Sequence, residues 1–317
     1  MRAVGGLPKD MQILYGIRGE RRLPEYEAPW LAGYGGSKPV HIGNAAHKQF
    51  QLDVFGEFMS AMHLARTHSG QSDDDDAWRF QRAVMDYLEQ HWQDPDQGLW
   101  EVRGRARDFT QSKVMAWMAV DRCIKAVERF NLDGPVDRWR TLRDTIHAQV
   151  CDRGFNRELN TFTQYYGGTT MDAALLTRPQ TGFLKATDPR FVGTVAAVEQ
   201  HLLDPYGFVL RYQPDQAVDG MPGTECAFLP CSFWLATAYH LMGRRDDARR
   251  LFDKLLALRN DVGLLSEEYD GRRRLQMGNF PQAFTHVALV ATANLLVGRA
   301  GAEDPLGTAD AAGQGEA

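Results

Sequence analysis

Two acidic segments of this sequence carry the residue types that acid–base chemistry requires. Glu101 follows a tryptophan in residues 98–104 (GLWEVRG), a glycine-flanked stretch between two predicted helices. Glu267 and Glu268 are adjacent in residues 265–270 (LSEEYD), in another predicted loop far downstream. Two carboxyl groups that face one cleft can cleave a glycosidic bond, because one protonates the leaving oxygen while the other activates water or attacks the sugar. Such chemistry needs a scaffold that brings these distant loops together.

The composition is that of an ordinary folded protein. Hydrophobic residues make up 44% and charged residues 24% of the 317 residues, near the average of globular domains. The formal net charge of −5, without a basic block, argues against a nucleic-acid partner. No apolar run approaches the roughly 20 residues of a membrane helix, so we expect no membrane partner.

The sequence also predicts a cytoplasmic location and no bound metal. Residues 1–10 lack the apolar core of a signal peptide. The four cysteines form no Cys-x-x-Cys pair, which is typical of reduced thiols in a cytosolic protein. No His-Glu-x-x-His or similar metal-ligand spacing occurs, and no glycine-rich phosphate loop joins a strand to a helix. We therefore expect neither a metal nor a cofactor.

Apolar residues recur at helical spacing along most of the chain. The pattern predicts helices over residues 45–67, 73–91, 110–130, 135–150, 188–203, 227–242, 246–258 and 281–297, with a shorter one at 171–176. The best strand signal is the short segment 207–212. Long loops alternate with short ones, and the long ones contain Glu101, Tyr166, Arg211 and Glu267.

Paired helices with their long loops at one end predict an all-α fold, an α/α toroid with its site at that end. We expect an irregular lead-in segment over residues 1–44 and the toroid over residues 45–300. Residues 301–317 consist largely of Gly, Ala and acidic residues without periodicity, so we expect a disordered tail there.

Several sequence blocks, in the same order, resemble those of glycoside hydrolase family 15, which contains glucoamylases and some bacterial trehalases. The blocks lie at residues 43–44 (GN), 51–57 (QLDVFGE), 98–104, 109–113 (FTQSK), 227–229 (AFL), 231–235 (CSFWL), 265–270 and 278–286 (GNFPQAFTH). The resemblance implies an (α/α)6 toroid of the six-hairpin glycosidase type. It also implies inverting hydrolysis of α-glucosidic bonds in carbohydrate metabolism, with an oligo- or disaccharide of α-linked glucose as the substrate.

The same resemblance implies roles for individual residues. Glu101 matches the general acid of the family and Glu267 its general base, with the adjacent Glu268 as the fallback. An inverting pair must leave room for a water molecule, so we expect the two carboxyl groups to lie roughly 6.5–9.5 Å apart. Arg211 resembles a family arginine that contacts the sugar. The alternative for each acid is an exposed loop or capping residue without a role in catalysis.

Three further residues are candidates for substrate binding, each with a structural alternative. The guanidinium group of Arg103, two residues after the acid, could bind sugar hydroxyls or form a surface ion pair. Trp100 and Tyr166 could stack on a pyranose ring or lie buried in the core.

The sequence departs from the family pattern at its start. The periodicity gives about nine of the twelve helices of a complete toroid. The Trp-Arg-Asp segment with which the family grips the sugar has no counterpart upstream of residues 43–44. An incomplete ring would expose apolar helix faces, so we expect a partner chain or a missing N-terminal region to complete it. The alternative function is a truncated, catalytically impaired paralogue that acts as a carbohydrate-binding or protein-interaction module.

Overall fold

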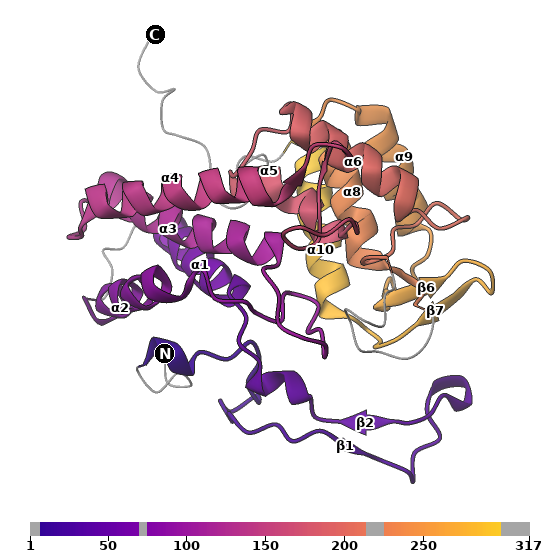
Figure 1. The fold of residues 1–317 in the computed structure, drawn as a ribbon. Coiled ribbons are helices and arrows are strands. Elements are labelled where there is room, and N and C mark those ends of the chain that lie inside the picture. The colour runs from indigo at the N-terminus through magenta and orange to yellow at the C-terminus, as the bar shows by residue number, and fades with distance from the viewer. Residues whose placement is uncertain (1–6, 70–74, 214–224, 299–317) are drawn as a thin grey trace.

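The computed structural model describes residues 7–69, 75–213 and 225–298, and helices dominate these residues (Figure 1). The α-helices of this part of the chain number nine. Their bounds are α1 (Asp53–Ser69), α2 (Asp75–His91), α3 (Thr110–Phe130), α4 (Val136–Arg153), α5 (Arg178–Thr181), α6 (Pro189–His201), α8 (Leu229–Leu241), α9 (Arg245–Leu256) and α10 (Ala283–Leu296). Short 3-10 turns precede or connect them at Pro8–Asp10, Tyr34–Gly36, Ala45–Lys48 and Ala173–Thr177.

Helix α3 is the centre of the first half of the molecule. It packs between α1 and α4, and most of its side chains are buried. Gly56 allows the close approach of α1, because a Cβ atom there would lie 2.6 Å from the backbone oxygen of Met115 in α3. Helix α8 has the corresponding place in the second half, where it packs against α9 and α10. Each half therefore has its own central helix and hydrophobic core.

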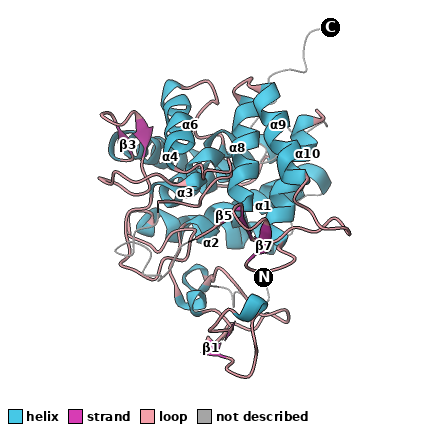
Figure 2. Cartoon of the chain, turned by 90° about the vertical axis from the view of Figure 1, so that its right-hand side faces the viewer, coloured by secondary structure: helices cyan, strands magenta, loops and turns pink. Residues whose placement is uncertain are grey.

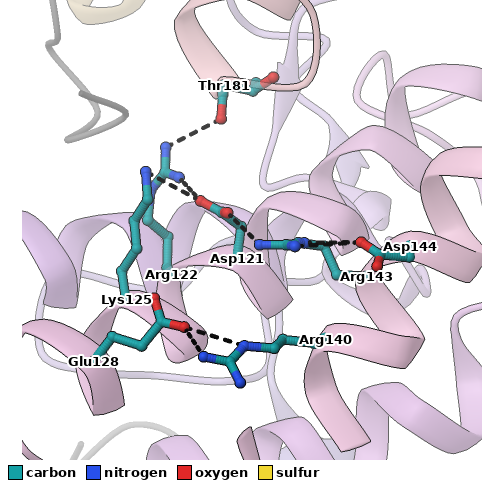
Figure 3. Close-up of polar contacts among 8 residues, drawn as sticks. All are labelled: Asp121, Arg122, Lys125, Glu128, Arg140, Arg143, Asp144 and Thr181. Atoms are coloured by element: carbon teal, nitrogen blue, oxygen red, sulfur yellow. Dashed lines mark hydrogen bonds and ion pairs between the residues drawn. The ribbon is translucent and has the colours of Figure 1, made fainter. Parts of the chain in front are cut away.

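A polar network joins α3 to helices α4 and α5 (Figure 3). Asp121 of α3 accepts a hydrogen bond of 2.6 Å from the buried Arg122 and lies 3.6 Å from Arg143 of α4. Arg122 also donates to the backbone oxygen of Thr181 at the end of α5, at 3.2 Å. The charge of the buried guanidinium is thus compensated, as buried charges must be.

The strands are short and belong to the loops. Strand β1 (Tyr26–Glu27) pairs with β2 (His41–Ile42) in the lead-in segment, and β3 (Phe155–Asn156) pairs with β4 (Thr161–Phe162). A three-stranded antiparallel sheet is formed by β5 (Ala227–Phe228), β6 (Glu268–Asp270) and β7 (Leu275–Met277). Both views place the β1–β2 segment apart from the helices, at one end of the molecule (Figures 1 and 2).

The observed elements correct two predictions. The first predicted helix begins at residue 53 instead of 45, because the Asn44 side chain caps a 3-10 turn and the chain is extended after it. The predicted strand over residues 207–212 is wrong. Its residues form isolated bridges, Val209 with Leu203 and Tyr212 with Asp172, because its backbone hydrogen bonds go to several different segments and not to one paired strand. The predicted tail lies outside the described residues.

No helix among the described residues is long and apolar enough to cross a membrane.

Candidate active site

The loop that carries Glu101 has an unusual backbone. Gly98 and Glu101 both have positive φ angles, 68° and 54°. This region is uncommon for a residue with a side chain, and such positions often coincide with functional sites. The backbone oxygen of Glu101 accepts a hydrogen bond of 3.2 Å from the Gln49 side chain. The surrounding chain therefore holds Glu101 in a conformation that it would rarely adopt alone.

The carboxylate of Glu101 has a fixed neighbour. Its Oε2 atom accepts a hydrogen bond of 2.9 Å from the Nδ2 atom of Asn44. The Oδ1 atom of the same Asn44 accepts from the backbone N–H of Ala46, also at 2.9 Å. Because the amide oxygen is occupied in this way, its NH2 group must face Glu101. The carboxylate thus lies where the lead-in segment meets the acidic loop.

Trp100 fixes the acidic loop to the second half of the molecule. Its indole is 8% exposed and donates a hydrogen bond of 2.8 Å to Asp172. Its ring centre lies 5.6 Å from that of Phe228 in β5 and 6.0 Å from that of Trp234 in α8. Aromatic rings at such distances attract one another beyond simple burial. The tryptophan therefore positions the glutamate that follows it.

Glu267 lies on the loop immediately before β6 and is held by Asn279. Its Oε2 atom accepts hydrogen bonds from the backbone N–H and the Nδ2 atom of Asn279, at 2.9 and 3.0 Å. Gly278 makes this approach possible. It has a φ angle of 72°, and a Cβ atom there would lie 2.7 Å from the same carboxylate oxygen. The two N–H donors stabilise a negative charge on that oxygen and fix its direction.

The adjacent Glu268 has different surroundings. It is the first residue of β6, lies opposite Phe228 of β5, and accepts a long hydrogen bond of 3.4 Å from the backbone N–H of Cys226. Burial, and to a lesser degree the negative charges of Glu225 and Glu267, raise the pKa of Glu268 to about 7, although Arg211 opposes this. Successive residues of a strand point to opposite faces, which explains the different partners of the two glutamates.

Arg211 is the centre of a small charged group, the Arg211 cluster, which consists of Arg211, Glu225 and Glu268. The guanidinium group forms a paired contact with the carboxylate of Glu225 and lies 3.8 Å from that of Glu268. Burial disfavours its charge, but the hydrogen bond to Glu225 and the two carboxylates outweigh this, so the pKa of Arg211 is raised. Arg211 is therefore held as a cation in a half-buried position.

The two acidic loops meet through the aromatic rings between them. Trp100 contacts Phe228, and the guanidinium of Arg211 lies 5.9 Å from the first ring and 5.2 Å from the second. The residue after Phe228, Leu229, donates its backbone N–H to the backbone oxygen of Glu267 at 3.0 Å. Trp100, the neighbour of Glu101, and Glu268, the neighbour of Glu267, thus both lie close to Arg211.

Two other predicted binding residues have partners of their own. Arg103 forms two hydrogen bonds with Glu25, at 2.9 and 2.7 Å, which connect the lead-in segment to the acidic loop. Tyr166 is half-buried, with the guanidinium of Arg153 lying 4.8 Å from its ring centre. The sugar contacts of Trp100, Arg103 and Tyr166 stay predictions.

The sequence reasoning did not identify Asn44 and Asn279 as site residues. Each is the second residue of a Gly-Asn pair, and each donates to one of the two predicted catalytic acids. The repeated Gly-Asn pair was therefore a usable signal. Among the described residues no group of three or more His, Cys, Asp or Glu is arranged to hold a metal ion.

Comparison with known proteins places the chain in a family. The family model "Glycosyl hydrolases family 15" matches residues 1–294. A trehalase of Mycolicibacterium smegmatis is 39% identical over 280 residues, which cover 88% of this chain and 42% of that protein. A trehalase of Thermoplasma acidophilum is 38% identical over 284 residues, which cover 89% of this chain and 48% of that protein. The chain thus spans less than half the length of these curated relatives.

Solved structures agree on the fold. A glycosidase variant in complex with glucose has a TM-score of 0.68 and 16% identity, over 83% of this chain and 72% of that chain. A bacterial glucoamylase complexed with acarbose has a TM-score of 0.67 and 13% identity, over 86% of this chain and 44% of that chain. At such identities the likeness concerns the fold alone, and it confirms the predicted class, a helical fold of the glucoamylase (α/α)6 toroid type.

Proposed function

The chain belongs to glycosyl hydrolases family 15, and we propose that it hydrolyses α-glucosidic bonds at the place where the two acidic loops meet. The observation that carries the proposal is that Trp100, next to Glu101, contacts Phe228, which pairs with Glu268, next to Glu267, although 166 positions separate the two glutamates Glu101 and Glu267 in the sequence. Each is also held by an asparagine side chain. Functional side chains need such supporting hydrogen bonds to keep a productive geometry.

The two glutamates divide the work of an inverting reaction. Glu101 gives its proton to the leaving oxygen, and Glu267 takes a proton from the attacking water molecule. The assignment of the base is supported by the two N–H donors on Glu267, because a general base must start as a carboxylate. The carboxylate of Glu101 accepts one hydrogen bond, from Asn44. We expect the carboxyl groups to stand roughly 6.5–9.5 Å apart when water is bound between them.

The Arg211 cluster is the proposed contact for the sugar. The guanidinium group is about one-fifth exposed, with a side-chain accessibility of 19%, and lies against two aromatic rings. An arginine held in this way by carboxylates presents its remaining N–H groups in a fixed direction. Hydrogen bonds to sugar hydroxyls from a pre-oriented donor lose little side-chain entropy on binding.

The substrate class follows from the relatives. Proteins named trehalase match most of this chain, and a related fold binds glucose in a solved complex. A disaccharide or oligosaccharide of α-linked glucose is therefore the proposed substrate, and trehalose and maltose are the first compounds to test.

The test is a glucose-release assay with the full chain on trehalose and maltose. We expect release by the parent chain, with the β-anomer formed first in NMR spectra, and loss of release in Glu101→Gln and Glu267→Gln. Glu158→Gln, at an exposed glutamate of the β3–β4 turn, is the matched control and should keep parental activity. Parental activity in Glu101→Gln, or the α-anomer as the first product, would refute the assigned roles.

The alternative of a binding module has its own outcome in calorimetry. If the parent chain binds trehalose or maltose but releases no glucose, the site is a carbohydrate-binding site without turnover. Glu101→Gln should then bind with the affinity of the parent chain.

A further inference from the structure

The residues just before α1 run beside the loop that carries Glu101. Residues 49–52, which we call the bracing segment, lie between the 3-10 turn that Asn44 caps and the start of α1. The backbone N–H of Phe50 donates to the side-chain oxygen of Gln97, and the backbone oxygen of Phe50 accepts from the N–H of Gln97, both at 3.1 Å. The bracing segment therefore holds the loop of the acid where that loop begins.

The loop itself is a turn closed by two backbone hydrogen bonds. The N–H of Glu101 donates to the backbone oxygen of Gly98 at 3.1 Å, and the N–H of Val102 donates to that of Gln97 at 3.3 Å. These bonds use the N–H groups of Glu101 and Val102. Their two backbone oxygens must therefore find hydrogen-bond donors outside the turn.

Gln49 of the bracing segment supplies these donors. Its Nε2 atom donates to the backbone oxygens of Glu101 and Val102, at 3.2 and 3.1 Å. Its Oε1 atom accepts a hydrogen bond of 2.9 Å from the Nε2 atom of Gln51, a side chain that is only 3% exposed. Because the amide oxygen of Gln49 is occupied in this way, its NH2 group must face the turn. The buried Gln51 thus sets the orientation of Gln49.

We propose that Gln49 is a positioning residue for the general acid Glu101, and that Gln51 orients Gln49 for this task. Glu101 has a positive φ angle, which residues with a side chain rarely adopt unless their surroundings impose it. Asn44 contacts the carboxylate, whereas Gln49 holds the backbone from which that carboxylate extends. This inference rests on the proposed function, because it assigns Gln49 to one step of that reaction.

Gln49 serves the acid and not the base. Glu267 is held by Asn279, which follows β7, and the bracing segment contacts the other acidic loop. Loss of Gln49 should therefore impair the transfer of a proton to the leaving oxygen and leave the activation of water intact. Displacing a catalytic group by about 1 Å can cost about 10²-fold in rate, so a loosened turn should have a measurable effect.

The test compares two substrates that differ in their need for a proton. Cleavage of trehalose or maltose releases a sugar oxygen that must gain a proton, whereas α-glucosyl fluoride releases fluoride, which needs none. Gln49→Met keeps the length of the side chain but has no N–H donor. We expect it to lower kcat on the disaccharide about tenfold to a hundredfold, with KM within about twofold of the parent value. On α-glucosyl fluoride, kcat should fall less than about threefold.

A double variant shows whether Gln49 acts through Glu101. In the Glu101→Gln background, adding Gln49→Met should lower the residual kcat on the disaccharide by less than about twofold, because a positioning residue has no effect once the acid is gone. Independent roles would instead give losses that multiply.

Two further variants separate the lost donor from a lost fold. Gln49→Glu keeps an oxygen that can accept from Gln51 but has no NH2 group, so it should behave like Gln49→Met on both substrates. It replaces the methionine variant if that variant does not fold. Gln90→Met, at an exposed glutamine of α2, is the matched control and should keep parental rates on both substrates.

Hydrogen exchange reports the same contact without turnover. Gln49→Met should speed amide exchange over residues 98–104 about tenfold or more, because the turn loses two hydrogen bonds. Exchange in α3 should stay at the parental rate. If the parent chain releases glucose from neither disaccharide nor from α-glucosyl fluoride, the proposed function fails, and exchange over residues 98–104 alone decides whether Gln49 holds the turn.

Three results would overturn the inference. Equal losses on the disaccharide and on α-glucosyl fluoride would show that Gln49 supports the fold as a whole. Multiplying losses in the double variant would show that Gln49 acts independently of Glu101. Parental exchange over residues 98–104 in Gln49→Met would show that its two hydrogen bonds do not hold the turn.

Discussion

Glu101 and Glu267 each accept a hydrogen bond from the asparagine of a Gly-Asn pair, but the two loops hold them differently. At Glu101 the backbone itself is in the left-handed region, and one side-chain amide reaches the carboxylate. At Glu267 the left-handed residue is the neighbouring Gly278, and two N–H groups reach a single oxygen. At the first loop the positive φ angle belongs to the glutamate itself. At the second it belongs to Gly278, the residue before the asparagine that holds Glu267. The proposed base therefore accepts two hydrogen bonds from N–H groups at one oxygen, whereas the carboxylate of the proposed acid accepts one.

The largest effect should come from removing either carboxylate. Glu101→Gln and Glu267→Gln should each lower kcat on trehalose or maltose by about 10²- to 10⁴-fold, the usual contribution of a general acid or base. α-Glucosyl fluoride separates the two roles, because fluoride leaves without a proton. Glu101→Gln should recover much of its rate on this substrate, and Glu267→Gln should not. If Glu267→Gln recovers its rate on this substrate and Glu101→Gln does not, Glu267 is the acid and Glu101 the base.

The next effect should come from the partner loop of the base. Asn279→Ala removes one of the two donors to Glu267 and leaves the backbone N–H in place. A hydrogen bond to a charged group contributes about 1.5–3 kcal/mol. We therefore expect kcat to fall about tenfold to a hundredfold, with little change in the melting temperature because Asn279 is exposed. Gly278→Ala should act in the same direction, since its Cβ atom would displace the carboxylate oxygen. Unchanged kcat in both variants would show that Asn279 does not position the base.

The sequence predicted the bounds of one helix to the residue. Helix α3 begins at Thr110 and ends at Phe130, as predicted, because Asn131 takes the left-handed conformation that ends a helix. The segment 45–52 failed because its apolar spacing is compatible with a helix, whereas the Asn44 side chain stabilises a 3-10 turn there. The spacing of apolar residues carries no information about such a competing contact between a side chain and the backbone.

The candidate site was less predictable than the helices. Family resemblance selected Glu101 and Glu267, but the partners Asn44 and Asn279 depend on contacts across 57 and 12 positions of the sequence. The choice between Glu267 and Glu268 depends on strand alternation in β6, and a three-residue strand gives no readable pattern. Contacts of this kind form only when the chain folds, so they cannot be predicted from the spacing of residues in one sequence.

A smaller effect concerns stability at the second acidic loop. Between pH 4.5 and pH 7 the folded chain keeps a proton on Glu268 that the unfolded chain has released, since its pKa is raised from 4.5 to about 7. The contribution of Glu268 to the free energy of unfolding therefore falls as the pH rises through this window. Glu268→Gln mimics the protonated form, so its stability should exceed that of the parent chain by about 3 kcal/mol at pH 7 and by about 1 kcal/mol at pH 5. Chemical denaturation at both pH values measures the difference, and the other buried acids cancel because both chains contain them. A difference that does not grow with pH would show that Glu268 is already ionised at pH 5.

The smallest effect should come from Asn44, and it separates catalysis from stability at the first loop. Asn44→Ala removes both the donor to Glu101 and the cap on Ala46. We expect kcat to fall severalfold and the free energy of unfolding to fall by about 1 kcal/mol, the usual cost of losing such a cap. Asn44→Asp keeps a capping oxygen but replaces the donor with a negative charge beside Glu101. Its stability should therefore lie closer to that of the parent chain, while its kcat falls as in the alanine variant and the alkaline limb of its pH–rate profile moves upward, because that limb reports loss of the proton from the acid. If Asn44→Asp restores kcat together with stability, Asn44 acts on the 3-10 turn alone, and Glu101 depends on its own backbone for its position.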